Sequence, residues 1–510
     1  MTVQSPPPIL DRLAELGTGG PPPSIDSIWI DGTARPADGG QTLVVEDPST
    51  ESVLANVSRG GAADVDAAAK SARAALDGSW ATITPQARGN LLLALAQLID
   101  DNADRLARLE TLDVGKPLSQ ARSDMAGAAA TLRYNAGAAD KLEGISVPLG
   151  PDFVDFTELE PLGVTAHIMP WNYPLGMAMR SLAPALAAGC TAILKPAEQT
   201  PLTTLVLAEL AVQAGIPAGV VNVVTGLGEE AGAALTEHPS VAGVTFTGSV
   251  ETGRRVGAAA GGALKPAVLE LGGKNPMIVF DDADLERAVE SAIDGAFDNC
   301  GQVCSSVSRL LLHARIRAPF LERFVERASA RRVAAGLDDA DLGPLVSAAQ
   351  HDKVIGHIES AIRDGARLCL GGGRPAGMDK GHFIAPTVFD EVNPSSPIAR
   401  EETFGPVVTA FGFSDEAEAL ALANGLPYGL VAGIHTADID RALRFARGLA
   451  AGSVWINGWF IGGVQAPTGG IKDSGFGRER GLAGIHNYLS IKNIGVQFHR
   501  QANAGDDASA

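Results

Sequence analysis

Apolar and polar positions follow two different periods along this chain, and the period changes near residue 160. Between residues 62 and 98 the apolar residues recur at helical spacing, which predicts a helix over 62–76. A second helix begins where Thr84 can serve as N-cap and Pro85 occupies the first turn, and its apolar face runs to Leu98. Beyond residue 163, short apolar runs alternate with helical segments. Such alternation predicts parallel strands with helices on both faces of the sheet.

The alternating part of the chain divides into two blocks. In the first we expect strands at 163–169, 191–195, 220–224 and 241–247, and helices at 175–188, 203–214, 229–237 and 250–259. In the second we expect strands at 276–280, 309–312 and 452–456, and helices at 285–298, 318–331 and 348–364. A chain of 510 residues is too long for one core, so the two blocks predict two α/β domains.

Four segments fall outside this pattern. Residues 1–24 are rich in proline and glycine and predict a flexible arm, and residues 501–510 predict a flexible tail. Residues 152–160 and 490–497 are polar and β-prone, so neither fits inside a parallel core. They predict either paired edge strands at a subunit interface or an ordinary surface hairpin.

Charge and cysteine content narrow the class of protein. The formal charge is 40 − 59 = −19, which disfavours nucleic acid and membrane surfaces as partners. Four cysteines are too few for a disulfide framework, and their spacing predicts no metal site. The N-terminus has no signal-peptide pattern, and the longest apolar stretch, 182–194, is too short to cross a bilayer. We therefore expect a cytoplasmic enzyme.

One cysteine lies in a setting that suits a nucleophile. Cys304 lies between Gly301 and Ser306, among small and polar neighbours, where a thiolate would find access and hydrogen-bond donors. The alternative is a buried structural cysteine. Cys190 and Cys369 lie in apolar runs and are assigned to the core. Cys300 lies one helical turn before Cys304. It either shares the pocket of Cys304 or simply packs against its neighbours.

Two further side chains follow predicted strands. Glu270 ends an apolar strand beside two glycines, so it is either a base at the mouth of a cleft or a solvated strand end. Asn172 follows the strand at 163–169 in a loop stiffened by two prolines. Its amide could donate to an oxyanion, or it could form an Asx turn.

Three strand-to-helix turns could hold a dinucleotide. Lys195-Pro-Ala-Glu198 follows a strand, as a ribose site does in doubly wound sheets. The glycine-rich stretch 226–232 departs from GxGxxG by one residue, and Phe246-Thr-Gly248-Ser249 precedes a helix start that could hold phosphate. Each turn alone is equally consistent with an ordinary connection.

Together these segments resemble the aldehyde dehydrogenase superfamily, including its betaine and aromatic aldehyde dehydrogenases. The resemblance runs from about residue 28 to residue 497 and rests on seven motifs in order: PWNYP, KPAEQTP, FTGS, ELGGKNP, GQVCSS, EETFGPV and GGIKDSGFGRERG. It implies an α/β fold with a Rossmann-type NAD-binding domain (25–148 and 162–271) and an α/β catalytic domain (272–483). It also implies a small β oligomerisation element (149–161 and 484–500) and a homodimer or homotetramer.

The resemblance also implies roles for individual residues. Cys304 would attack the aldehyde, Asn172 and the Cys304 backbone N–H would stabilise the oxyanion, and Glu270 would activate the water that hydrolyses the thioester. The cofactor would be held by Trp171, Lys195, Glu198, Gly228, Phe246, Gly248, Ser249, Leu271, Glu402 and Phe404. The substrate pocket would include Tyr173, Met177, Trp459, Phe460 and Thr468.

The chain departs from the family pattern near the substrate. Thr468 stands where many members have phenylalanine, and Arg180-Ser181 stands where many have Trp-Lys. We therefore expect a bulky or aromatic aldehyde, or a semialdehyde. A Thr468→Phe variant should weaken the preference for bulky aldehydes, and an unchanged preference would count against this expectation.

Other readings remain for the cofactor and the reaction. Glu198 favours NAD over NADP, because a carboxylate binds ribose hydroxyls and repels a 2′-phosphate. A CoA-acylating enzyme typically lacks a general-base glutamate at the position of Glu270, and a non-catalytic protein would be expected to lack Cys304 or Asn172. A betaine or amino-aldehyde substrate is a further alternative.

Overall fold

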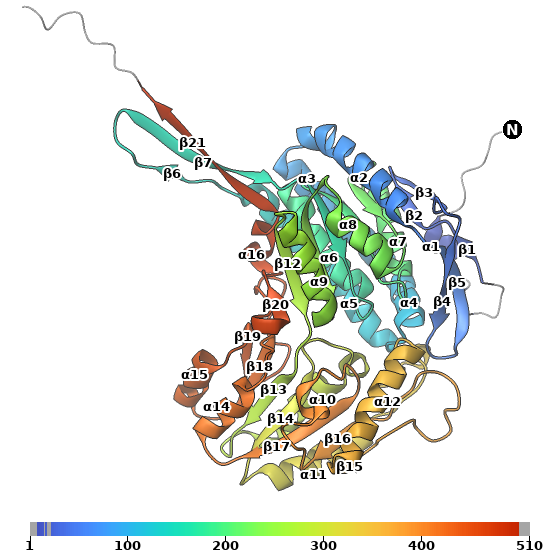
Figure 1. Ribbon diagram of the computed structural model, residues 1–510, viewed down its shortest axis with the longest axis vertical. Coiled ribbons are helices and arrows are strands. Elements are labelled where there is room, and N and C mark those ends of the chain that lie inside the picture. The colour runs from blue at the N-terminus through green and yellow to red at the C-terminus, as the bar shows by residue number, and fades with distance from the viewer. Residues whose placement is uncertain (1–7, 15, 18–21, 499–510) are drawn as a thin grey trace, which may run out of the picture.

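The computed structural model describes residues 8–14, 16–17 and 22–498, and its first large unit is an eight-stranded sheet (Figure 1). Five parallel strands form its centre: β8 (Val164–Ile168), β9 (Thr191–Lys195), β10 (Val221–Val223), β11 (Val241–Gly248) and β12 (Ala267–Leu271). The strand order is β20-β12-β11-β8-β9-β10-β2-β3. The chain thus winds outward from β8 in one direction and from β11 in the other. This places a topological switch point between β8 and β11.

Helices cover this sheet where the apolar pattern predicted them. They are α2 (Ala62–Asp77), α6 (Pro174–Ala188), α7 (Leu202–Gln213), α8 (Ala233–Glu237) and α9 (Val250–Gly262). A π-helical turn, η3 (Gly228–Gly232), forms the first half of the helix expected at 229–237. Three more helices, α3 (Pro85–Asp101), α4 (Ala103–Val114) and α5 (Leu118–Ala138), pack behind them in the same core. Thr84 caps α3 as expected, because its hydroxyl accepts a hydrogen bond from Ala87 N at 3.2 Å.

Short strands complete the edges of the first unit. β2 (Ile28–Ile30) and β3 (Thr33–Arg35) extend the sheet beyond β10, and β20 (Gly475–Phe476) pairs with β12 at the other edge. A small separate sheet joins β1 (Ser24–Ile25), β5 (Ser52–Ser58) and β4 (Thr42–Asp47). A segment near the C-terminus therefore returns to the first sheet and lies beside the strand that ends near Glu270.

The second unit is a seven-stranded sheet with its own core, in the lower half of Figure 1. Its order is β15 (Arg367–Leu370), β16 (Thr387–Asp390), β17 (Val407–Phe413), β14 (Val307–His313), β13 (Asn275–Val279), β18 (Val431–His435) and β19 (Ser453–Ile456). All neighbours are parallel except the edge pair β15–β16. The helices are α10 (Leu285–Phe297), α11 (Arg317–Ser329), α12 (Ala348–Arg363), α13 (Pro397–Arg400), α14 (Glu416–Asn424) and α15 (Ile439–Gly448). The prediction of two α/β units is thereby confirmed, whereas the exact domain boundaries stay predictions.

A three-stranded antiparallel sheet projects from the body of the molecule (Figure 1). It consists of β6 (Ser146–Val147), β7 (Phe153–Pro161) and β21 (Leu489–Gln497), with α16 (Gly481–His486) leading into β21. The pairing of β7 with β21 runs unbroken from Phe153 opposite Gln497 to Pro161 opposite Leu489. The two polar β-prone segments are therefore partners, although they lie more than 300 residues apart.

Part of the segment expected to be a flexible arm is packed. Helix α1 (Ile9–Arg12) lies against α7, its backbone N–H at Ile9 donates to Glu209 at 3.0 Å, and Leu10 is buried. The prediction of a flexible arm was wrong for these residues, because proline content hid a short apolar run. The rest of that prediction at 1–7, 15 and 18–21, and the tail at 501–510, lies outside the described residues. Within the described part of the chain, no helix has the length and apolarity needed to cross a membrane.

Candidate active site

The predicted motifs meet where the two large sheets face each other. In the first sheet they follow the carboxyl ends of β8, β9, β11 and β12. From β12 the chain crosses directly to the amino end of β13, and the Cys304 loop precedes the amino end of β14 beside it. Ligands of doubly wound sheets bind outside the carboxyl ends of the strands at the switch point. The topology therefore brings Asn172, Glu270 and Cys304 to one junction.

The loop that carries Cys304 is not a continuation of α10. The helix ends at Phe297, and Asn299, Cys300 and Gly301 follow with φ values of 45°, 56° and 70°. This left-handed run turns the chain so that Cys300 packs in the core of the second unit and Cys304 is only half-buried. Burial raises the pKa of Cys300 to about 12, so this thiol stays protonated. Cys300 therefore packs in the core and does not share the pocket of Cys304.

The remaining two cysteines differ from each other. Cys190 is fully buried, as expected. Cys369 is half-buried on the edge strand β15 and packs against the margin of the second core, so its assignment to the core holds only in part. The apolar run around it belongs to an edge strand with an exposed face, which the sequence pattern alone does not distinguish from a central strand.

Hydrogen bonds tie the Asn172 loop to the Cys304 loop. Asn172 Nδ2 donates to the carbonyl of Gln302 at 2.9 Å, and Asn299 Nδ2 donates to the carbonyl of Asn172 at 2.9 Å. Among the described residues, the Asn172 side chain therefore bonds to a residue 130 positions away and does not form an Asx turn. An amide nitrogen carries two hydrogens, so one donor of Asn172 is left for a substrate oxygen.

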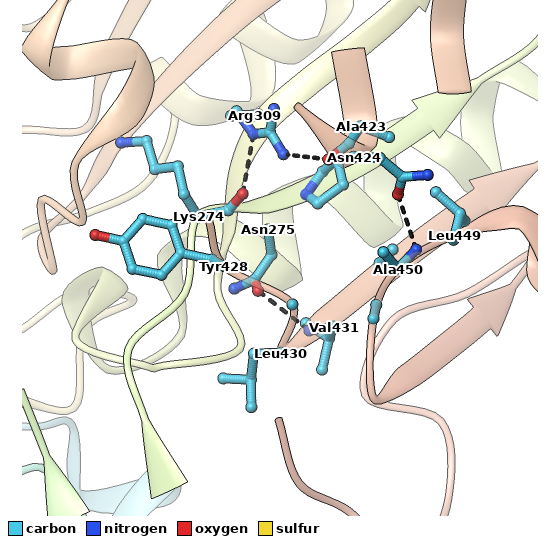
Figure 2. Close-up of a pocket in the computed structure, with 14 residues that line it drawn as sticks. Lys274, Asn275, Arg309, Ala423, Asn424, Tyr428, Leu430, Val431, Leu449 and Ala450 are labelled. Atoms are coloured by element: carbon cyan, nitrogen blue, oxygen red, sulfur yellow. Dashed lines mark hydrogen bonds between the residues drawn. The ribbon is translucent and has the colours of Figure 1, made fainter. Parts of the chain in front are cut away.

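The turn between β12 and β13 is anchored to the same loop. Asn275 Nδ2 donates to the carbonyl of Cys304 at 2.8 Å, and its Oδ1 accepts from Val431 N at 3.3 Å. Arg309 Nε donates to the carbonyl of Lys274 at 2.9 Å. Figure 2 centres on a cavity of about 10 Å³ behind this turn, which holds no more than a water molecule. The cavity is structural, and the turn itself is held rigidly beside Cys304.

The surroundings of Cys304 favour its protonated thiol over the thiolate. Burial raises its pKa to about 11, the nearby Arg180 lowers it, and Glu402, Glu270 and Glu479 raise it. A cysteine in this environment is mostly protonated at neutral pH. Nucleophilic attack then requires a base that accepts the thiol proton.

Glu270 is buried and is not the solvated strand end that the sequence left open. It is 5% exposed, and its Oε1 has no hydrogen-bond partner among the described residues. Burial, reinforced by Glu479, raises its pKa well above the ordinary value. An ideal Cβ on Gly469 would come within 2.6 Å of Glu270 Oε1, so only glycine leaves room for the carboxylate there.

An ion pair that the sequence analysis did not assign lies beside these residues. Arg180, from α6, contacts Glu479 at 2.5 Å, with side-chain exposures of 16% and 5%. Arg180 also donates to the sulfur of Met177 at 3.2 Å. Arg180 was noted only as a departure from the family pattern, and Glu479 stands inside the quoted motif GFGRERG. The available signal was the single charge of Arg180 within the otherwise mainly apolar stretch 174–188.

The residues expected to hold the adenosine end of a dinucleotide lie together. Lys195 Nζ contacts Glu198 Oε2 at 3.3 Å, and Lys195 is buried whereas Glu198 is half-exposed. Ser249 caps the thirteen-residue helix α9, which follows β11 at the switch point. A helix start at this place offers backbone N–H groups to phosphate oxygens. These donors therefore fit the ribose and pyrophosphate of a dinucleotide.

The nicotinamide end is expected beside Glu402 and Phe404. Gly273 N donates to Glu402 Oε1 at 3.0 Å, and a Cβ on Gly272 would lie 2.1 Å from Glu402 Oε2. The Phe404 ring packs edge-on against Trp171, with ring centroids 5.2 Å apart. The two glycines thus admit a carboxylate, and by the same absence of side chains they would admit a flat ring.

The other cofactor candidates have supporting positions. Phe246 and Leu271 are buried and pack beneath glycines: a Cβ on Gly248 would contact the Phe246 ring at 2.6 Å, and a Cβ on Gly253 would contact Leu271 at 2.4 Å. Gly228 opens the η3 turn and has no neighbour within 4 Å of an added Cβ. Phe246 and Leu271 thus support the backbone of the site at Gly248 and Gly253.

The substrate candidates separate into two groups. Tyr173 donates its hydroxyl to Asp298 at 2.6 Å, and Asp298 and the half-exposed Phe460 line one cavity of about 240 Å³. Trp459 is only 9% exposed and donates its indole N–H to the carbonyl of Ser305 at 2.9 Å. Thr468 pairs by its backbone with Glu479. Trp459 thus supports the Cys304 loop, Phe460 borders the cavity, and Tyr173 is linked to the cavity wall only through Asp298.

Comparison with known proteins agrees with this geometry. The family model "Aldehyde dehydrogenase family" matches residues 35–494. A hydroxyisobutyraldehyde dehydrogenase from Mycolicibacterium austroafricanum is 45% identical over 500 residues, or 98% of each chain. The structure of an aldehyde dehydrogenase from Bacillus cereus in complex with NAD⁺ superimposes with a TM-score of 0.92 at 41% identity and covers 93% of this chain and 97% of its own. An NADP-dependent enzyme from E. coli has a TM-score of 0.91 at 39% identity, covering 93% of this chain and 98% of its own.

Proposed function

Because the chain belongs to the aldehyde dehydrogenase family, we propose that it oxidises an aldehyde to a carboxylic acid through a thioester on Cys304. The observation that carries this proposal is the joining of the Asn172 and Cys304 loops through Gln302 and Asn299, which leaves one amide N–H of Asn172 free beside the nucleophile. A structural cysteine would need no such donor.

In the first step the Cys304 sulfur attacks the carbonyl carbon, and the thiol proton passes to a base. The tetrahedral thiohemiacetal carries an oxyanion, which the Asn172 amide and the Cys304 backbone N–H stabilise. One fixed donor of this kind contributes about 3–4 kcal/mol to the transition state in comparable sites. The donors require no reorganisation, because both loops are held by hydrogen bonds to each other.

A dinucleotide supplies the hydride acceptor when it is bound. Lys195 and Glu198 would hold the adenosine ribose, and the start of α9 at Ser249 would hold phosphate. Glu402 and Phe404 would position the nicotinamide ribose and ring. We infer a preference for NAD, because the half-exposed Glu198 would bind ribose hydroxyls and repel a 2′-phosphate.

Glu270 would then activate the water that hydrolyses the thioester. Its raised pKa, caused by burial and by Glu479, makes it a stronger base once ionised. The carboxylate has one oxygen without a partner, and this oxygen is available to a water molecule. A CoA-acylating reaction has no need of this base, so hydrolysis is the favoured second step.

The substrate class that we favour is a bulky or aromatic aldehyde, or a semialdehyde. The cavity lined by Phe460 and Asp298, to which Tyr173 donates, and the small side chain of Thr468 support a roomy pocket. An amino-aldehyde is the alternative, because Asp294, Asp298 and Asp341 line that cavity against a single cation, Arg331. Arg331 is paired with two of these carboxylates, and Asp298 is bound by Tyr173.

We further propose that the protein is a homodimer or homotetramer. The β6–β7–β21 sheet exposes apolar side chains away from the body, among them Val154 and Val496, which face each other across the strands. A second copy would bury this surface and the free edge of β21.

The direct test is NADH formation by the purified protein across aliphatic, aromatic, amino- and carboxy-substituted aldehydes. Cys304→Ala should abolish it, because no thiohemiacetal can form, and Cys190→Ala, a buried cysteine outside the site, should retain it. Each active aldehyde should give a higher kcat/KM with NAD than with NADP. NADH that forms only after CoA is added, or that survives in Cys304→Ala, would contradict the proposal.

A further inference from the structure

The surroundings of Glu270 and Glu479 contain more cations than the catalytic groups require. Three arginines lie near the two carboxylates Glu270 and Glu479: Arg180, Arg478 and Arg480. Arg180 is paired with Glu479 at 2.5 Å. Arg478 donates its Nη1 to the backbone carbonyls of Gly470 at 3.0 Å and Gly477 at 2.6 Å. Both of these guanidinium groups therefore have a structural use.

Arg480 has no such use. Within the part of the chain that the structure describes, its guanidinium has neither an ion-pair partner nor a hydrogen-bond acceptor. The side chain is half-buried, and repulsion by Arg180 together with burial lowers its pKa to about 10. Glu479 and Glu270 attract this cation, but neither bonds to it, so they offset its lost hydration only in part.

The backbone conformation of Arg480 is also unfavourable in free energy. Its φ is 61° and its ψ is 171°, a combination that is otherwise almost confined to glycine. The segment is held there on both sides, since Glu479 pairs by its backbone with Thr468, and Gly481 N donates to the carbonyl of Val464 at 2.9 Å. Strained residues of this kind gather at ligand sites, where the surrounding structure fixes them.

The position of this cation relates it to the substrate. Arg480 lies within electrostatic range of Cys304 and Glu270, and its neighbour Glu479 is bonded to Thr468, a position that the sequence assigns to the substrate pocket. The hydrocarbon tail of an aldehyde bound to Cys304 would pass through this region. A guanidinium is suited to a carboxylate, which it binds through two parallel hydrogen bonds.

We propose that Arg480 is a specificity-determining residue that binds a carboxylate on the tail of the aldehyde, so that the enzyme prefers semialdehydes to uncharged aldehydes of equal length. This proposal rests on the proposed function and narrows its substrate class. Arg180 plays a supporting part, because it is already neutralised by Glu479 and leaves Arg480 as the free cation.

The test compares aldehydes that differ only in the carboxylate. The kcat/KM values for 4-oxobutanoate and 6-oxohexanoate are measured against those for butanal and hexanal, in the wild type, Arg480→Gly and Arg480→Lys. Glycine removes the cation and suits the positive φ, so this variant should fold. We expect the wild type to prefer the carboxylated member of at least one pair by tenfold or more. Arg480→Gly should lower that ratio at least tenfold, and Arg480→Lys should retain part of it.

A binding measurement gives a readout other than turnover. Succinate and adipate should bind the wild-type protein in calorimetric titrations and should bind Arg480→Gly at least tenfold more weakly. The proposal is overturned if neither pair shows a preference, if 4-aminobutanal is preferred to butanal and 4-oxobutanoate, or if Arg480→Gly slows charged and uncharged aldehydes equally. A protein that forms no NADH from any of these aldehydes would contradict the proposed function itself, which is a distinct outcome.

Discussion

At the scale of single residues, burial raises the pKa of Cys304 to about 11, and Arg180 is the cation that lowers that value most. Alkylation by iodoacetamide should therefore accelerate about tenfold per pH unit between pH 7 and pH 10, because only the thiolate reacts. The sign follows from the raised pKa: the reactive form is scarce at neutral pH and gains population as the pH rises towards 11.

Removal of Arg180 should raise this pKa further. At pH 8 we expect Arg180→Gln to be alkylated at Cys304 several-fold more slowly than the wild type, since Glu479 also loses its partner. Arg254→Gln is the matched control, because Arg254 forms an exposed ion pair with Asp473 at 2.8 Å. Mass spectrometry of the Cys304 peptide measures the rate. Equal rates in all three proteins would show that Arg180 does not act on the thiol.

At the scale of elements, the Cys304 loop is held in place by the segment after β19. The Trp459 ring occupies the space above Gly433 and Gly295, where added Cβ atoms would come within 2.4 Å and 2.7 Å of it, and its N–H holds the carbonyl of Ser305. Trp459→Phe keeps a ring but removes this hydrogen bond, which contributes about 1 kcal/mol. We expect a five- to tenfold lower kcat, on the order of 1 kcal/mol, with a smaller change in KM.

The control for this prediction is Trp455→Phe. The Trp455 ring packs against Trp459 at 5.0 Å, but no described residue accepts a hydrogen bond from its indole. Steady-state kinetics and thermal unfolding separate the two roles. If both variants lose the same activity and the same thermal stability, Trp459 acts only through packing.

Elements with a clear apolar period could be predicted from the sequence, and those without it could not. The helix at 85–101 and the strands β8, β9 and β11 follow directly from spacing and capping residues. The left-handed run at 299–301 could not be predicted, because Asn299 favours positive φ only weakly and Cys300 does not favour it at all. That run decides that Cys300 packs and Cys304 faces the site. The role of Trp459 was likewise hidden, because its partner Ser305 lies 154 residues away.

At the scale of the whole molecule, the projecting sheet has apolar side chains and a strand edge that a single chain leaves uncovered. Ile491 on β21 is 73% exposed, and the sheet has a free strand edge. If a second copy covers this sheet, Ile491→Lys should lower the mass measured by light scattering towards that of a monomer, because it introduces a charge into the interface. Val44→Lys is the control, since Val44 is 57% exposed on β4, which belongs to the separate β1-β5-β4 sheet. A wild type that is itself a monomer would contradict the proposed assembly.

The central claim is the thioester on Cys304 and its hydrolysis by Glu270, and the variant Glu270→Gln tests both at once. Mixed with NAD and an aldehyde that the wild type oxidises, this variant should release one NADH per subunit in a burst and then nearly stop. Peptide mass spectrometry should find the acyl group on Cys304, as a mass increase equal to the mass of the aldehyde less two hydrogens. A variant that turns over at the wild-type rate, or a burst that leaves Cys304 unmodified, would contradict the account.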